Sequence, residues 1–284
     1  MGTYVITGAG SGMGRATMEQ LRWEGHKVIG VDLKGTDINV DLSTDAGVRE
    51  AVQSIITKSE GRVDGAILAA GLGPIPGRGD LIARVNYGGV VGVLEGLHDV
   101  LAAAGNAKVV VFSSNSTTTT PGVPREIVQA FFDRDYDEVK RIAEETGGKE
   151  HAENFIYAGS KLAVTYWMRT IGVTPKWAGA GIRVNAIAPG AIMTPLLSKQ
   201  LADPETAQAI KDFPIPVGDF GSRTEVAQWV IFMLSPAANF MCGSVIVIDG
   251  GTDAYFRAND YPWPIPMEDA PKYMEKLEAF KNQK

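Results

Sequence analysis

The chain has 284 residues, of which 45% are hydrophobic and 21% charged, so an extensively disordered protein is excluded. Its 27 basic and 33 acidic residues give a net charge of −6 with no Lys/Arg-rich run, which argues against a nucleic-acid partner or an anionic membrane surface. The one cysteine, Cys242, excludes an intrachain disulfide framework and a multi-cysteine metal site, and the three histidines lack metal-ligand spacing, so no metal is expected.

Short apolar runs alternate with helical patterns along the chain. The expected strands are Tyr4–Thr7, Lys27–Asp32, Asp37–Asp41 (the weakest), Gly65–Ala69, Lys108–Ser113, Ile182–Ala188 and Ser244–Ile248. The expected helices are Met13–Glu24, Thr44–Ser59, Arg84–Ala104, Phe155–Gly179 and Thr224–Leu234. Continuous apolar strands are typical of parallel sheets buried on both faces, and strand–helix alternation indicates right-handed crossovers. The sequence therefore predicts an α/β fold, a doubly wound parallel β-sheet (Rossmann fold) with helices on both faces, within a single domain of residues 1–251.

Two segments do not fit this alternation. An insert at 116–154 opens with a threonine-rich loop and continues with apolar residues at near-helical spacing, namely Ile127, Val128, Phe131, Phe132, Val139, Ile142 and Ala143. A C-terminal extension at 252–284 contains Tyr261–Pro266, whose three prolines exclude a regular helix, and then a charged helical end. We expect the insert to line the substrate pocket and to alter subunit packing. The extension is expected to cover the pocket or contact a neighbouring subunit, with a disordered end as the alternative.

A glycine-rich loop, Thr7–Gly14, follows the first strand and leads into a helix. Glycines let the backbone approach a pyrophosphate closely, and the helix start directs N–H groups at the anion. The spacing is T-G-x-x-x-G-x-G rather than the G-x-G-x-x-G of many dehydrogenases. The residues expected to hold the phosphates of a dinucleotide are Gly8, Ser11, Gly12, Met13 and Gly14. A glycine-rich turn without a ligand is the alternative.

Acidic residues after the second and third strands indicate which dinucleotide binds. Asp32 ends the second strand, where its carboxylate can accept a hydrogen bond from a ribose 2′-hydroxyl and repel a 2′-phosphate. This pattern favours NAD as the cofactor, although Lys34 nearby leaves NADP open. Asp41 and Leu42 follow the third strand and are expected at the adenine; alternatively, Asp41 belongs to the cap of the next helix.

With these residues the sequence resembles the short-chain dehydrogenase/reductase family. The remaining motifs that carry the resemblance are Ala69-Ala70-Gly71, Asn86-Tyr87-Gly88-Gly89, Ser113-Ser114, Tyr157-Ala158-Gly159-Ser160-Lys161 and Pro189-Gly190-Ala191-Ile192-Met193-Thr194. The first departs from the family's Asn-Asn-Ala-Gly, because Leu68 and Ala69 stand where the asparagines would be. A closer similarity, to the 3α-hydroxysteroid dehydrogenase/carbonyl reductase subgroup, rests on Ala70–Pro74, the insert, Ile187–Ala191, Thr194–Leu197 and Val247–Gly251.

The resemblance implies a set of catalytic and cofactor-binding residues. The implied catalytic residues are Asn86, Ser114, Tyr157 and Lys161, with Ser113 as the fallback for the serine. The further implied cofactor contacts are Ala70, Gly71, Tyr157, Lys161, Pro189, Gly190, Ile192 and Thr194. In the family, the serine donates a hydrogen bond to the substrate oxygen and the asparagine holds a water that links the lysine to solvent.

Tyr157 is the expected general acid or base. A free tyrosine has a pKa near 10, which is too high for a good base at neutral pH. Lys161 lies one helical turn away on the same face, and its charge, together with the oxidised nicotinamide, is expected to lower the pKa of Tyr157. Tyr136 and Lys140 repeat the same spacing, but carboxylates crowd that tyrosine, so we expect Tyr136 on a solvated helix face. His151 is expected in a surface loop and Cys242 as a small buried hydrophobe.

The sequence thus predicts an NAD(H)-dependent oxidoreductase that interconverts a secondary alcohol and a ketone on an apolar, cyclic (steroid- or terpenoid-like) substrate. One alternative is a 3-oxoacyl-type ketone reductase of the same family, and another is a non-catalytic dinucleotide-binding protein. A homodimer or homotetramer is expected. No run of about 20 apolar residues and no signal-peptide pattern stands out, so the cytoplasm is the expected compartment.

Overall fold

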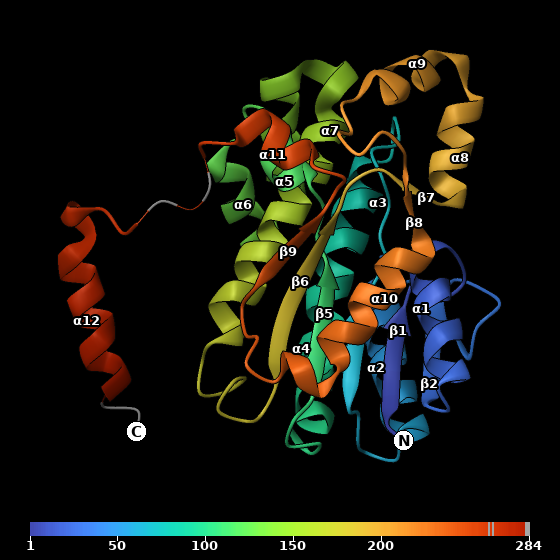
Figure 1. Cartoon of the computed structure of the whole chain (residues 1–284), viewed down its shortest axis with the longest axis vertical. Helices are drawn as coiled ribbons and strands as arrows, with labels where there is room; N and C mark the ends of the chain where they lie inside the picture. Colours follow the sequence, from blue (N-terminus) through green and yellow to red (C-terminus); the bar gives the residue numbers. More distant parts are fainter. Residues whose placement is uncertain (261, 263, 282–284) are drawn as a thin grey trace.

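The computed structural model describes residues 1–260, 262 and 264–281, and its centre is a seven-stranded sheet covered by helices on both faces (Figure 1). The strand order is β3-β2-β1-β4-β5-β6-β9, and every neighbouring pair is parallel. The strands are β1 (Thr3–Thr7), β2 (Lys27–Asp32), β3 (Ile38–Asn39), β4 (Gly65–Leu68), β5 (Lys108–Phe112), β6 (Arg183–Pro189) and β9 (Val245–Ile248). The doubly wound α/β fold expected from the sequence is confirmed.

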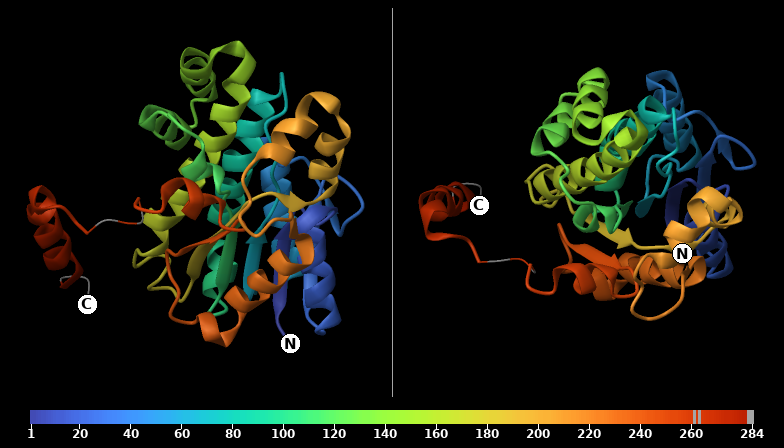
Figure 2. Two further views of the ribbon diagram at one scale, coloured as in Figure 1. Left: turned by 45° about the horizontal axis from the view of Figure 1, so that its top comes forward. Right: turned by 90° about the horizontal axis from the view of Figure 1, so that it is seen from above.

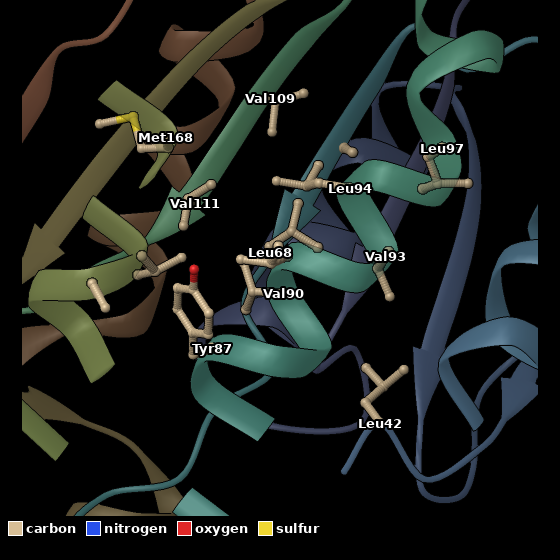
Figure 3. Close-up of a cluster of buried hydrophobic side chains, with 14 of the residues drawn as sticks. Leu42, Leu68, Tyr87, Val90, Val93, Leu94, Leu97, Val109, Val111 and Met168 are labelled. Carbon is tan, nitrogen blue, oxygen red and sulfur yellow. The ribbon is translucent and has the colours of Figure 1, made fainter. Parts of the chain in front are cut away.

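Two hydrophobic cores lie on the two faces of the sheet. On one face α1 (Gly12–Trp23) packs against α10 (Arg223–Leu234). On the other face lie α2 (Asp45–Lys58), α4 (Val90–Ala102) and α7 (Tyr136–Gly172). Figure 3 shows part of the second core, where side chains of α4 meet those of β4, β5 and α7. All five residues of β5 are buried, as expected of a strand with a helix layer on each face.

The order in which the chain adds strands to the sheet changes direction between β1 and β4. From β1 the chain moves outward to β2 and β3, and it then returns to β4 on the other side of β1 and continues to β9. Beyond the carboxyl ends of β1 and β4 the loops diverge, and this is where ligands bind in open α/β sheets. The glycine-rich loop after β1 therefore lies at this reversal point.

Three of the expected helices match the structure to within one residue at each end, whereas the bounds of the other two differ by more. The helix expected at Arg84–Ala104 begins earlier, as α3 (Gly79–Ala83), and passes through a π-helical turn, η1 (Arg84–Gly89), into α4. The helix expected at Phe155–Gly179 is α7, which begins within the insert and ends at Gly172. Pro175 explains the earlier end, because proline cannot continue the hydrogen bonding of a helix.

The insert is helical and packs on the body. It contains α5 (Ser116–Thr119), α6 (Arg125–Phe132) and the first part of α7, which is broken at Gly148, where φ is 68°. α6 buries Ile127 and Phe131 completely, and their side chains cover α7 at Gly159, where an added Cβ would lie 3.0 Å from Ile127. The near-helical spacing seen in the insert is thus confirmed as two amphipathic helices.

The remaining elements lie after β6. A separate two-stranded sheet pairs β7 (Ile192–Met193) with β8 (Gly221–Ser222), and two short helices lie between them, α8 (Pro195–Ala202) and α9 (Pro204–Asp212). The turn η2 (Pro236–Ala238) precedes β9, and the C-terminal extension contains α11 (Thr252–Arg257), η3 (Met267–Asp269) and α12 (Ala270–Lys281). α11 contacts α5, whereas α12 stands clear of the body in each view (Figures 1 and 2). The expectation for Tyr261 and Trp263 lies outside the described residues.

Among the residues that the structure describes, no helix combines the length and the apolar character that crossing a bilayer requires.

Candidate active site

The glycine-rich loop turns from β1 into α1 in a conformation that only glycine fits well. Gly8 and Gly12 have φ angles of 72° and 56°, in the left-handed region. A Cβ on Gly8 would lie 2.6 Å from the backbone nitrogen of Ala70, and one on Gly14 would overlap the carbonyl oxygen of Gly8. Ser11 occupies the N-cap position of α1. The loop therefore presents the free N–H groups at the start of α1 to the groove, the arrangement that binds a phosphate anion.

A groove of about 410 Å³ opens beside this loop. The predicted cofactor residues that line it are Gly8, Ser11, Gly12, Met13, Gly14, Asp32, Asp41, Leu42, Ala70, Gly71 and Thr194. The lining residues absent from the sequence prediction are Leu33, Val40, Ala69, Leu72, Leu81, Val85, Pro195 and Leu196. All of these are apolar, so no chemical signal distinguished them from core residues in the sequence. Their neighbours in the motifs were the only available guide.

The two acidic residues that line the groove, Asp32 and Asp41, also accept hydrogen bonds from backbone amides. The carboxylate of Asp32 accepts hydrogen bonds from the amides of Gly10 at 2.9 Å and Leu33 at 2.7 Å. These bonds hold the carboxylate at the end of β2. Asp41 accepts from Ser43 at 2.9 Å, while the cap of α2 is Thr44, whose hydroxyl accepts from the Gly47 amide at 3.0 Å. Asp41 thus lines the groove and also belongs to the cap cluster, because its carbonyl oxygen accepts from the Thr44 hydroxyl at 3.1 Å.

Three of the predicted catalytic side chains come together between β5 and α7. Ser114 lies two residues beyond the end of β5 and is hydrogen-bonded to the hydroxyl of Tyr157 on α7. The backbone amide of Ser116 donates to the Ser114 oxygen at 3.1 Å. Ser113, the fallback, instead pairs with the hydroxyl of Thr165 at 2.7 Å within the core. The structure therefore favours Ser114 over Ser113 as the serine that faces the site.

Lys161 lies beneath the tyrosine in a nearly dry environment. Only 5% of its surface is exposed, and its Nζ donates to the carbonyl oxygen of Phe112 at 2.8 Å. The same atom lies 6.0 Å from the centroid of the Tyr157 ring. Burial disfavours the ammonium form and lowers the pKa of Lys161 to about 8.

Without a dinucleotide beside it, Tyr157 has a raised pKa, and the lowering expected from Lys161 together with the oxidised nicotinamide stays a prediction. Burial raises the pKa of Tyr157, and the hydrogen bond with Ser114 opposes that increase. The physical reason is that both side chains are desolvated and that the lysine bonds to a backbone carbonyl instead of the phenol. In this state the neutral phenol is the favoured form of Tyr157.

Asn86 is completely buried and holds the loop that borders the site. Its Oδ1 accepts from the backbone amide of Leu72 at 2.8 Å. Its Nδ2 donates to the Leu72 carbonyl at 2.9 Å and to the Ser160 hydroxyl at 3.2 Å. A Cβ on Gly71 would lie 3.2 Å from the Asn86 Oδ1 and 3.4 Å from the Lys161 Nζ, so glycine leaves space beside both groups. The water that the family resemblance implies at Asn86 stays a prediction.

The segment after β6 borders the groove only in part. Thr194 lines it, accepts from the Leu197 amide at 3.3 Å and faces Gly12. The amide of Gly190 donates to the Ile248 carbonyl at 2.9 Å. The side chain of Ile192 turns away from the groove and packs in the core against Gly221, so only its backbone could serve the predicted cofactor contact.

Three residues set apart in the sequence lie in different surroundings from those expected. Tyr136 is not on a solvated face: it is half-buried, its hydroxyl covers Gly88, and burial rather than the neighbouring carboxylates is the main cause of its raised pKa. His151 is exposed, but on α7 instead of a loop. Cys242 is half-buried, with its sulfur 3.2 Å from the Gly172 carbonyl. Among the described residues, no group of acidic, histidine or cysteine side chains has the arrangement of a metal site.

Comparisons with known proteins find relatives that are named as dehydrogenases and reductases. Residues 140–253 match the family described as Enoyl-(Acyl carrier protein) reductase. The chain is 34% identical to a 3-alpha-hydroxysteroid dehydrogenase/carbonyl reductase of Comamonas testosteroni, over 92% of this chain and 100% of that protein. It is 30% identical to a 3-oxoacyl-[acyl-carrier-protein] reductase of Thermotoga maritima, over 87% and 96%. The solved structure of the 3-alpha-hydroxysteroid dehydrogenase from Pseudomonas sp. B-0831 with NADH is similar with a TM-score of 0.83 and 38% identity, over 91% and 100%.

Proposed function

Since this chain belongs to the short-chain dehydrogenase/reductase family of oxidoreductases, we propose that it interconverts a secondary alcohol and a ketone with NAD(H) on an apolar, cyclic substrate of steroid or terpenoid type. The observation that carries the proposal is the assembly of Ser114, Tyr157 and Lys161 beside the groove: a Cβ on Gly71, which lines the groove, would lie 3.4 Å from the Lys161 Nζ. A scaffold for binding alone would not require these three side chains together.

The groove fits a dinucleotide. The cradle of Gly8 and Gly14 leaves no room for a Cβ, so a phosphate can approach the backbone closely. Next to this loop the Asp32 carboxylate, which accepts from two backbone amides, suits a ribose 2′-hydroxyl and repels a 2′-phosphate. Leu72 and Leu196 give the groove apolar walls. NAD is therefore the dinucleotide that the residues favour over NADP.

The side chains have distinct roles in the proposed reaction. When bound, the dinucleotide accepts a hydride from the alcohol carbon or returns one to the ketone carbon. In the direction of ketone reduction, Ser114 donates a hydrogen bond to the substrate oxygen and Tyr157 gives that oxygen its proton. In the direction of alcohol oxidation, Tyr157 takes the hydroxyl proton, and the positive charge of Lys161 stabilises the resulting phenolate. Asn86 fixes Leu72 beside the site.

Replacing Asp32 with asparagine tests the choice of cofactor. We expect the ratio of kcat/KM with NAD to that with NADP to fall by about tenfold or more, since the variant no longer repels a 2′-phosphate. Asp37→Asn is the matched control, because Asp37 is a nearby carboxylate that accepts from the Gly30 amide at 2.7 Å and binds Arg22. An unchanged ratio in Asp32→Asn would contradict the assignment.

The activity itself is tested by following NADH absorbance with androsterone, a 3α-hydroxysteroid, and with cyclohexanol as a smaller alcohol. We expect turnover with NAD, faster for the steroid because it buries more apolar surface. The 3-oxoacyl reductase remains the second candidate, since a relative with that name is 30% identical over 87% of the chain. Preferential reduction of acetoacetyl thioesters with NADPH would support that candidate, and absence of turnover with every substrate would support a non-catalytic dinucleotide-binding protein.

Assembly and compartment form the last part of the proposal. We infer a homodimer or homotetramer in the cytoplasm. A single free thiol, Cys242, suits a reducing compartment. The insert lies where it can alter packing between subunits, because α6 covers the face of α7 at Gly159.

A further inference from the structure

The residue after the catalytic serine connects three strand ends. Asn115 is 8% exposed, and its backbone amide donates to the Pro189 carbonyl at the end of β6, at 3.0 Å. Its own carbonyl accepts from the hydroxyls of Thr118 and Thr119, each at 3.0 Å. Its side-chain amide donates to the carboxylate of Asp249, just beyond β9, at 3.4 Å. The turn that carries Ser114 is therefore attached to β6, α5 and the end of β9.

The carboxylate of Asp249 accepts three hydrogen bonds. One oxygen accepts from the Gly251 amide at 3.0 Å, and the other accepts from the Asp253 amide at 2.7 Å as well as from Asn115. These bonds fix the start of α11, which packs beside α5 (Figure 1). The backbone of Asp249 also lies so close to Gly190 that a Cβ there would sit 2.7 Å from the Asp249 Cα. The carboxylate is thus held in one place from several directions.

The orientation of the serine hydroxyl depends on this turn. The Ser116 amide donates to the Ser114 oxygen, so the hydroxyl hydrogen must point elsewhere, toward Tyr157 or a substrate oxygen. Asn115 lies between these two serines, and a rotation of its backbone would turn the hydroxyl away. Small displacements of catalytic groups are costly, since about 1 Å can lower a rate by about 10²-fold.

We propose that Asn115 and Asp249 are positioning residues that hold the Ser114 hydroxyl in line with Tyr157 and fix the serine turn against the segment after β6. This inference rests on the proposed function. By this proposal Asp249, the first residue after β9, contributes to the reaction without contacting the substrate oxygen.

A double-mutant cycle tests the proposal. In Asn115→Ala we expect kcat for androsterone oxidation to fall by about tenfold, with KM for NAD, the pH profile and the melting temperature nearly unchanged. In the Ser114→Ala background the same substitution should lower kcat by less than about twofold, because the group it positions is already gone. A merely structural role would give the same loss in both backgrounds. Asp249→Asn is the second variant, with the same non-additivity expected.

Asn106→Ala is the matched control. Asn106 makes an amide contact of the same length, 3.4 Å, to Asn239 near the opposite end of β5, and its loss should leave kcat within about twofold. Full kcat in both Asn115→Ala and Asp249→Asn would overturn the inference while leaving the proposed function intact, as would a tenfold loss that persists without Ser114. If the unaltered protein turns over no alcohol, the proposed function fails and this inference fails with it.

Discussion

Replacing Tyr157 with phenylalanine is expected to lower kcat by about 10²–10⁴-fold, the usual contribution of a general acid or base. The substitution removes the phenolic oxygen, which is hydrogen-bonded to Ser114 and is the atom expected to exchange the proton with the substrate. The ring stays in place, so the dissociation constant for NAD, measured by quenching of protein fluorescence, should change by less than about threefold. Turnover is measured by NADH absorbance in both directions.

Tyr136 provides an internal control for this experiment. Tyr136 and Lys140 have the same Tyr-x-x-x-Lys spacing, and Tyr136 is likewise half-buried with a raised pKa. Its ring, however, lies against Arg84, and it is the first residue of α7, well before Tyr157 on that helix. We expect Tyr136→Phe to keep kcat within about twofold. A Tyr157→Phe protein with full turnover, or a Tyr136→Phe protein without it, would show that the wrong tyrosine was chosen.

Replacing Lys161 with methionine is expected to lower kcat by about 10²–10³-fold, because a buried positive charge beside the reacting oxygen is lost. The same variant has a distinct signature in stability. The pKa of Lys161 is about 8 in the folded protein and 10.5 ordinarily, so between these values the unfolded chain binds one more proton than the folded one. The stability of the unaltered protein relative to Lys161→Met should therefore rise with pH in that window.

The size of this effect follows from the shift in pKa. Between pH 7.5 and 9.5 the difference in the free energy of unfolding should move by about 2 kcal/mol in favour of the unaltered protein. Urea unfolding of both cofactor-free proteins at the two pH values measures it, and other titrating groups cancel in the comparison. Lys161→Arg serves as a control that keeps the charge. A difference independent of pH would mean that Lys161 is not desolvated as the structure indicates.

Most of the fold was predictable because parallel strands that are buried on both faces appear in the sequence as continuous apolar runs. β5 is a continuous apolar run covered on both faces, and its predicted bounds differ from the observed ones by one residue. Helix ends were harder. The π-helical turn at η1 carries Tyr87, whose ring packs against Phe131 of the insert, a contact between distant parts of the chain that local sequence patterns do not show. The start of α7 was missed for a related reason, since Gly148 breaks the helix without ending it.

The residues of the candidate site likewise include some that the sequence could indicate and some that it could not. Glycines with required conformations and the Tyr157–Lys161 spacing depend on local backbone geometry, so the sequence pointed to them directly. The raised pKa of Tyr157 in the absence of a dinucleotide could not be read from the sequence, because helical spacing says nothing about burial or about the Phe112 carbonyl that accepts the lysine's hydrogen bond. Apolar groove residues such as Leu81 and Leu196 carry no mark that separates them from the core. Asn115 was missed because its partner, Asp249, lies 134 residues away.

That separation has a consequence during synthesis. The phosphate loop emerges from the ribosome among the first residues, yet the serine turn lacks its last anchor until β9 has joined the edge of the sheet beside β6. Because chain segments emerge in order from the N-terminus, a nascent chain that ends before Asp249 has a cofactor cradle and an unanchored serine. If Asn115 and Asp249 position Ser114 as proposed, the serine turn is completed only when the final strand pairs with β6.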